Sequence, residues 1–317
     1  MADMTLTDAR RQVVDLREER REAESPWRIA VRRFRKHRMA VFGALLMSLI
    51  VLFVIIGAFF YTEQYANTTS ILERNQPPSA EHVMGTDQVG RDILARVIYG
   101  GQISLMIAIV SVAISIALGT VIGLVAGYYG GWVDSVLMRI VEALLAIPTL
   151  ILLLMLSSVL SRSTATINIL GRELSATVLG IILIIGFTTW MPLSRIVRSL
   201  VLSLKEQEFV IAAESIGARN GRIIFTHVLP NCLAPIIVSA TLAVGNAIIT
   251  EAYLSFLGFG VLPPTATWGN ILTRAQENID GLWWMWMFPG IFIVLTVLAI
   301  NFIGDGLRDA MDPRSTK

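Results

Sequence analysis

"EFVIAAESIGARNGRIIFTHVLP", residues 208–230, lies between two uncharged runs that are each long enough to cross a membrane. The spacing of the apolar residues from 207 to 216 predicts a short helix with polar positions between them. Gly217 is expected to end this helix, and Asn220-Gly221 to form a tight turn. Because so short a helix is marginal in isolation, we expect it to dock on another surface.

The composition of the whole chain indicates a membrane protein. Of 317 residues, 54% are hydrophobic and 16% are charged, whereas about a quarter of an average soluble domain is charged. The single cysteine, Cys232, has no partner for an intrachain disulfide, and with only three scattered histidines the chain shows no metal-ligand cluster. We therefore expect no bound metal, and read Cys232 as a small apolar residue.

Six uncharged runs predict six membrane-spanning helices. Each run reaches the roughly 17 to 25 residues that a spanning helix needs. The runs, with His227 counted as neutral, are 39–62, 97–133, 143–161, 174–194, 223–250 and 281–304. The second run is long, but its three glycines and interfacial aromatic residues at 127–132 predict a turn at its end. The fold class is therefore predicted to be all-α.

The distribution of Lys and Arg predicts the orientation of the chain. With the N-terminus inside, 20 of the 26 Lys and Arg residues fall on the cytoplasmic side. The same topology places the C-terminus inside and makes residues 208–230 part of a cytoplasmic loop between the fourth and fifth spans.

The remaining segments divide the chain further. Residues 1–26 are expected to form a charged cytoplasmic tail, and 305–317 a second one. Residues 27–101 would hold an interfacial helix, the first span and an outer segment, and 102–304 a core of five spans with a cytoplasmic loop at 195–230. A basic flank without a helix of its own explains residues 27–38 equally well. In the outer segment, residues 85–92 are expected to supply turns and a helix cap.

The loop carries a recognisable motif. Ala212-Ala213, three residues, Gly217, eleven residues and Leu229-Pro230 resemble the cytoplasmic Glu-Ala-Ala loop of permease subunits of ABC importers. Two positions depart from that motif, since Ile211 stands where its Glu would be and His227 where its Ile would be.

Two further stretches are similar to one branch of this family. "HVMGTDQVGRDILARVIYGGQISL" (82–105) and "EAYLSFLGFGVLPPTATWGNIL" (251–272) resemble segments of the C-type subunit in the dipeptide, oligopeptide and nickel branch. The likeness covers nearly all of residues 27–313. It implies the type I ABC importer permease fold with six spans, in the cytoplasmic (inner) membrane of a prokaryote.

The resemblance also implies partners and a coupling site. The loop helix would fit a cleft on an ATP-hydrolysing subunit, so that a large charged residue at Ala213 would separate transport from ATP hydrolysis. The residues assigned to coupling are Glu208, Phe209, Ala212, Ala213, Glu214, Gly217, Arg219, Leu229 and Pro230. The expected partners are a homologous second permease subunit (a heterodimer), two ABC ATPases, an extracytoplasmic substrate-binding protein and the lipid bilayer, with no nucleic acid.

ATP chemistry is not expected in this chain. A phosphate-binding loop needs a Gly-Lys-Ser/Thr core, and none of the lysines, Lys36, Lys205 and Lys317, follows a glycine. The chain is therefore predicted not to be an enzyme and to bind no cofactor itself, with ATP and magnesium on the partner ATPases.

Alternative functions stay open at this point. The predicted substrate is a di- or oligopeptide, and a nickel-chelate importer of the same branch is the alternative. A self-sufficient secondary transporter or channel is less favoured, because such proteins usually keep charged groups at the bilayer midplane. Among membrane-embedded enzymes, an aspartyl protease needs Gly-x-Gly-Asp, which the sequence before Asp305 lacks.

Several residues within the spans have both a structural and a functional interpretation. A stripe of small residues every four positions predicts close helix packing: Ser111, Ser115, Gly119, Gly123 and Gly127. Glu251 and Ser255 are candidates for the passage or its outer gate, but Glu251 near a span end is better explained as an interfacial cap. Pro148 and Pro192 predict kinks or hinges, and Glu142 is expected to pair with Arg139.

Overall fold

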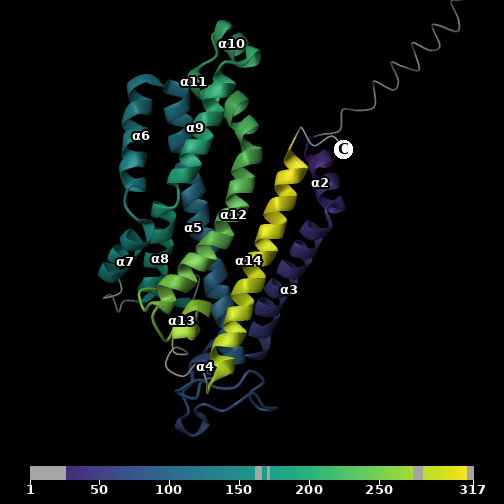
Figure 1. The fold of residues 1–317 in the computed structure, drawn as a ribbon, viewed down its shortest axis with the longest axis vertical. Coiled ribbons are helices and arrows are strands. Elements are labelled where there is room, and N and C mark those ends of the chain that lie inside the picture. The colour runs from purple at the N-terminus through teal and green to yellow at the C-terminus, as the bar shows by residue number, and fades with distance from the viewer. Residues whose placement is uncertain (1–25, 161–165, 170–171, 274–280, 313–317) are drawn as a thin grey trace, which may run out of the picture.

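The computed structural model describes residues 26–160, 166–169, 172–273 and 281–312, and the chain is predominantly helical (Figure 1). The predicted charged tail at 1–26 lies outside these residues except for its last position, as do residues 313–317 of the C-terminal tail. The all-α fold class is confirmed, although one short two-stranded hairpin was not predicted.

The elements follow one another with short connections. The helices of the first half are α2 (Pro26–Lys36), α3 (Arg38–Phe60), α4 (Glu63–Asn67), η1 (Ile71–Glu73), α5 (Ile93–Tyr129), α6 (Gly131–Leu145) and α7 (Thr149–Leu160). The antiparallel hairpin of β1 (Thr166–Ile169) and β2 (Arg172–Ser175) follows, with Thr166 opposite Ser175. The second half contains α8 (Ala176–Thr188), α9 (Met191–Lys205), α10 (Glu208–Ser215), α11 (Asn220–Ile223), η2 (Ile224–Val228), α12 (Leu229–Phe256), α13 (Trp268–Thr273) and α14 (Trp283–Met311).

The described residues contain five helical segments long and apolar enough to cross a membrane, and a sixth if one bent pair counts as a span. The bent pair is α6 with α7, whose axes differ by 82°. The kink or hinge predicted at Pro148 is therefore confirmed within the third span predicted at 143–161. Its run is broken at 146–148, where Pro148 lacks the N–H that a continuing helix would use. The predicted turn at 127–132 is confirmed, since α5 ends at Tyr129.

The small-residue stripe of α5 packs against α9 within the same chain. A Cβ added at Gly119 would lie 2.8 Å from the carbonyl oxygen of Trp190, and one at Gly123 would lie 2.6 Å from that of Ser194. A Cβ at Gly127 would approach Val201 Cβ to 2.7 Å. Because no side chain separates the two backbones, α5 and α9 are in direct contact along three turns. The predicted helix-packing role of the stripe is confirmed.

One end of the molecule gathers α2, the C-terminal end of α14 and the loop helix α10 (Figure 1). α2 is the helix expected at 27–38, and it is fastened to α14 by two polar contacts. Arg33 Nη1 donates to the carbonyl oxygen of Asp312 at 2.8 Å, and His37 Nε2 lies 3.4 Å from Asp309 Oδ2.

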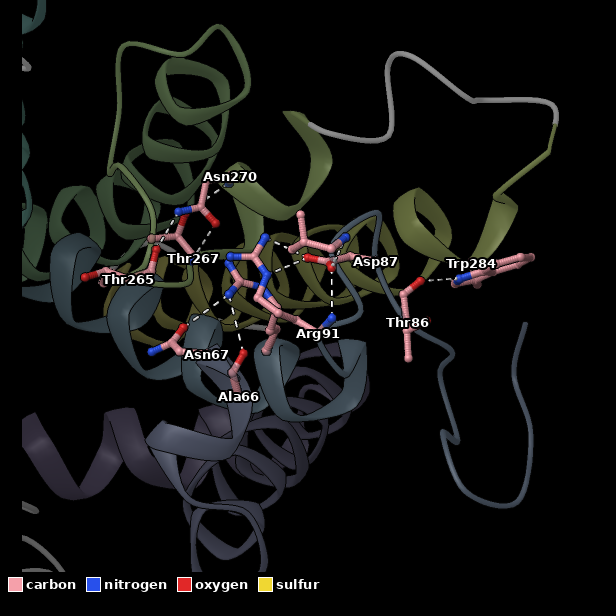
Figure 2. A network of polar contacts seen from close by, with 11 residues as sticks. Ala66, Asn67, Thr86, Asp87, Arg91, Thr265, Thr267, Asn270 and Trp284 are labelled. Carbon is pink, nitrogen blue, oxygen red and sulfur yellow. Dashed lines mark hydrogen bonds and ion pairs between the residues drawn. The ribbon is translucent and has the colours of Figure 1, made fainter. Parts of the chain in front are cut away.

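The opposite end is closed by a cap built from the segment before α5 and the segment around α13. Figure 2 shows Asp87 paired with Arg91, at 2.6 Å between Nη2 and Oδ2, and Trp284 donating to the carbonyl oxygen of Thr86 at 3.1 Å. Asn270 Nδ2 donates to the carbonyl oxygens of Val261 and Thr265, at 3.0 and 2.7 Å. The turns and the cap predicted at 85–92 are confirmed, since Gly85 and Gly90 have φ of 75° and 79° and the N–H of Ala95 donates to Asp92 Oδ1 at 2.8 Å at the start of α5.

The α5–α9 contact leads to a test with two matched substitutions. Gly123→Ala is expected to lower the apparent Tm in detergent, because its methyl group would force the helices apart at a cost of about 1–3 kcal/mol. Gly290→Ala is the control, since a Cβ at that position in α14 meets nothing within 4 Å. An equal effect of the two changes on the Tm would contradict the close packing.

Candidate functional site

The predicted loop helix exists as α10, between the end of α9 and the turn at Gly217. Gly217 has a φ of 80°, in the left-handed region that glycine adopts without strain. Gly217 N donates to the carbonyl oxygen of Glu214 at 2.9 Å, and Ala218 N donates to that of Ala213 at 3.1 Å. This pair of bonds is the Schellman motif, so the end predicted from the glycine is confirmed.

The inner face of α10 is packed on the subunit itself. Val210 and Ala213 are 0% and 5% exposed and join an apolar cluster with Val201 of α9, Ile223 of α11 and Cys232 of α12. This apolar cluster fixes the inner face of α10 on the subunit. The expectation that both alanines serve the docking of another protein is therefore wrong for Ala213, which faces the subunit's own core.

The outer face of α10 carries an apolar ridge. Phe209 is 42% exposed and Ile216 is 85% exposed, and Ala212 lies between them on the exposed side. These three residues, which we call the α10 ridge, are spaced by three and four positions and so share one face of a helical turn. Ile216 was not among the predicted coupling residues, although its position seven residues after Phe209 would have indicated it.

Polar contacts fix the ends of the loop to α5 and α6. Lys205 Nζ donates to the carbonyl oxygen of Tyr128 at 2.9 Å, and the Tyr128 hydroxyl donates to Asn220 Oδ1 at 3.3 Å. Arg198 of α9 forms a bidentate ion pair with Asp134 of α6, with 2.5 Å between Nη2 and Oδ2. The loop is therefore held by Lys205 before α10, by Asn220 at the start of α11 and by Arg198 along α9.

The second half of the loop is continuous with the fifth span. α11, η2 and α12 follow without an interruption, and together they form one candidate span of 37 residues, Asn220–Phe256. η2 is a stretch of π-helix, a form that is rare and frequent at functional sites. A displacement of α10 therefore reaches the membrane through a helix rather than through a flexible connection.

The remaining predicted coupling residues lie around α10. Glu208, Glu214 and Arg219 are exposed, Leu229 is half-buried, and Pro230 is exposed in the first turn of α12. Phe225 of η2, which was not predicted, is also a largely exposed aromatic residue.

The expected pair of Arg139 with Glu142 on α6 is present at 4.0 Å, but both side chains are exposed and the pair contributes little to stability.

Glu251 and Ser255 occupy a different place from the one predicted. Glu251 is 0% exposed, so the expectation of a carboxylate near water at a span end is wrong. Its Oε2 accepts a hydrogen bond from Ser104 Oγ of α5 at 2.9 Å, and its Oε1 accepts one from Ser255 Oγ at 2.8 Å. Ser104 Oγ in turn accepts from the backbone N–H of Trp268 in α13 at 3.2 Å. The two residues thus join three helices inside this chain.

Sequence comparison identifies the family to which the chain belongs. Residues 119–317 match the model of the binding-protein-dependent transport system inner membrane component, and residues 25–78 match the model of the N-terminal transmembrane domain of oligopeptide transport permease C. The chain therefore belongs to the binding-protein-dependent inner-membrane permease components and is a multi-pass membrane protein.

Individual relatives are similar over nearly the whole length. The dipeptide transport system permease protein of Alkalihalophilus pseudofirmus is 42% identical, over 94% of this chain and 93% of the relative. A putative peptide permease protein of Brucella suis is 42% identical, over 92% of each chain. The oligopeptide transport system permease protein of Bacillus subtilis is 37% identical, over 92% of this chain and 91% of the relative.

The Schellman end of α10 can be tested by comparing two glycines of the same loop. A Cβ would meet nothing within 4 Å at either Gly217 or Gly221, but only Gly217 has a positive φ. Gly217→Ala is expected to speed amide hydrogen exchange in α10, because the left-handed conformation costs a residue with a Cβ about 1–2 kcal/mol. Gly221→Ala should leave the exchange of α10 unchanged, and equal exchange in the two variants would contradict this role of Gly217.

Proposed function

We propose that this chain is a membrane-spanning permease subunit of an ATP-driven importer of dipeptides or oligopeptides. The substrate class rests on relatives that carry peptide-transport names and match more than nine tenths of the chain. The coupling function rests on one structural observation, the exposed apolar α10 ridge on a helix whose inner face, formed by Val210 and Ala213, is packed on the subunit.

The α10 ridge has the pattern by which a helix binds in a groove. Anchors at positions i, i+3 and i+7 of an amphipathic helix are the usual contacts in that mode, and Phe209, Ala212 and Ile216 supply them. Ala212 between two larger side chains allows the helix backbone to approach its partner closely. The partner we propose is an ATP-hydrolysing subunit, because this chain has no phosphate-binding loop in its sequence.

The proposed mechanism is a rigid-body transfer of motion. Binding and hydrolysis of ATP with magnesium would move the partner ATPases, and α10 would follow because its ridge is held by them. α9 precedes α10 directly, and α11, η2 and α12 follow it as one continuous helix. The movement would therefore pass to the fourth and fifth spans, which would open the passage to alternate sides.

The complex we propose contains this chain beside a homologous second permease as a heterodimer, two ATPases and an extracytoplasmic substrate-binding protein. α10 and both described ends of the chain lie at one end of the molecule (Figure 1), which supports a common cytoplasmic side for them. The excess of Lys and Arg in residues 1–38 and 195–222 supports the same orientation. Selectivity among peptides would lie largely in the binding protein.

The composition of the complex is the first test of this proposal. The chain should be tagged at its C-terminus, extracted in a mild detergent and purified, and the associated proteins identified by mass spectrometry. We expect one or two ATPases with phosphate-binding loops and a second multi-span permease. A chain that purifies alone and still transports a labelled dipeptide into liposomes without ATP would refute the importer.

The α10 ridge is tested by placing the same charge at two exposed positions. Ala212→Glu is expected to reduce peptide-stimulated ATP hydrolysis and transport at least about tenfold, since it buries a carboxylate in the contact with the ATPase. Ser203→Glu, in the last turns of α9 and outside the ridge, should leave both rates near those of the unmodified complex. Normal coupling in the Ala212→Glu complex would argue against this contact.

Ala213→Glu, compared with Ala212→Glu, distinguishes a defect in the folding of α10 from a defect in its docking on the ATPase. Because Ala213 is buried against α9 and α11, a glutamate there is expected to loosen α10 itself, seen as faster amide exchange and lower thermal stability. Ala212→Glu should change neither property of the isolated subunit. The two adjacent alanines therefore distinguish loss of the contact from loss of the helix.

A further inference from the structure

An apolar groove opens between α2 and the membrane-spanning helices at the end of the molecule where both described termini lie. Its volume is about 390 Å3, within the range of small-molecule sites, and apolar atoms form nearly all of its wall. α2 contributes Ala30 and Phe34, α3 contributes Ala44, α12 contributes Ile237, and α14 contributes Leu307. Four helices therefore enclose a space that offers almost no hydrogen-bond partner.

A basic surface adjoins this groove. A second hollow of about 590 Å3 is lined by Arg28, Val31, Arg32, Arg35 and Lys36. Their spacing of three and four positions places all five on one face of α2. Val31 and Arg35 line both hollows, so the apolar groove and the basic surface form one continuous site.

The position of α2 is fixed by contacts on its other side. Arg33 donates to the carbonyl oxygen of Asp312, and His37, just after α2, lies 3.4 Å from Asp309 Oδ2, so the carboxylate of Asp309 lies on that side. A Cβ added at Gly306 of α14 would lie 2.1 Å from Ala40 Cβ, which shows how closely α3 and α14 approach below the groove. The groove is therefore built into the fold.

The outer face of α2 carries an excess of positive charge. Arg28, Arg35 and Lys36 are exposed and form no ion pair with the residues that the structure describes. The first turn of α2 contains no acidic residue, and its last turn holds Arg33, Arg35 and Lys36. A ligand with negative charge at one end and an apolar remainder would match both parts of the site.

We propose that this site binds one anionic phospholipid, with its phosphate against Arg28, Arg35 and Lys36 and an acyl chain in the groove. α2 directly precedes the spanning helix α3, so its basic face lies at the depth of lipid headgroups, where such clusters attract anionic lipids. An inserted non-helical protein segment fits less well, because its backbone polar groups would find no partners among the apolar groove residues. The bound lipid would fill the space between α2 and the helices α3, α12 and α14, and its contacts would hold the four helices together.

The test measures lipid retention by native mass spectrometry of the full chain, purified with the subunits it keeps, from nanodiscs of phosphatidylglycerol or phosphatidylcholine. We expect one phosphatidylglycerol to be retained in preference to phosphatidylcholine. The triple change Arg28→Gln, Arg35→Gln and Lys36→Gln should weaken this retention by about tenfold or more. The control removes three exposed basic residues elsewhere, by Arg139→Gln, Arg195→Gln and Arg222→Gln, and should leave retention unchanged.

A second variant separates a lipid site from general attraction to a charged surface. Ala44→Phe fills the groove from α3 without altering any charge, and it should also lower phosphatidylglycerol retention. The proposal is overturned if the control triple lowers retention as much as the α2 triple, or if Ala44→Phe has no effect. It is likewise overturned if a cross-linker placed at Ala44 captures the second permease subunit instead of lipid.

Discussion

Direct backbone contact between α5 and α9 is the constraint on which the rest of the structure depends. Gly119, Gly123 and Gly127 bring the two helices together without intervening side chains, and the Asp134–Arg198 ion pair adds α6 to them. α9 leads directly into α10, so the place of the loop helix is set by how α9 sits on α5. In a membrane, where lipid is as apolar as leucine, this kind of close packing is the main source of helix association.

In the proposed mechanism the loop turns that packing into a mechanical element, because one face of α10 is packed on the subunit and the other is exposed. Val210 and Ala213 hold α10 on the subunit, whereas Phe209, Ala212 and Ile216 are left exposed. If α10 were loosely attached, a force on its ridge would move α10 alone. Little of the motion would then reach the spanning helices. Here the Schellman turn and the shared apolar cluster leave the helix few ways to move apart from α9 and α12.

Much of this arrangement could be predicted from sequence, because its signals are local. The uncharged runs, the glycine spacing of α5 and the end of α10 at Gly217 each depend on neighbours within a few turns of the same segment. Glu251 could not be placed in that way, because its burial depends on Ser104, 147 positions earlier, and on the segment around α13 that closes over it. The bend between α6 and α7 was expected as a kink or hinge at Pro148, but its angle of 82° was not predicted, for another reason. Hydropathy counts apolar residues and does not register that the helix stops before Pro148.

The cap around Glu251 and the helix α10 are held by different kinds of interaction. This difference affects which end of the molecule moves more easily. The end with the outer cap is fixed by directional bonds, since the carboxylate of Glu251 holds Ser104 and Ser255 on different helices. At the end with α10, polar contacts hold the flanking residues Lys205, Asn220 and Arg198, but the inner face of α10 itself is fixed by an apolar cluster, which tolerates small sliding movements that a set of buried hydrogen bonds does not. A force applied to the α10 ridge by the proposed partner would therefore first move the end that deforms more easily. The buried polar contacts would meanwhile keep α5, α12 and α13 in fixed positions relative to one another. The spans would then tilt as a body about the capped end.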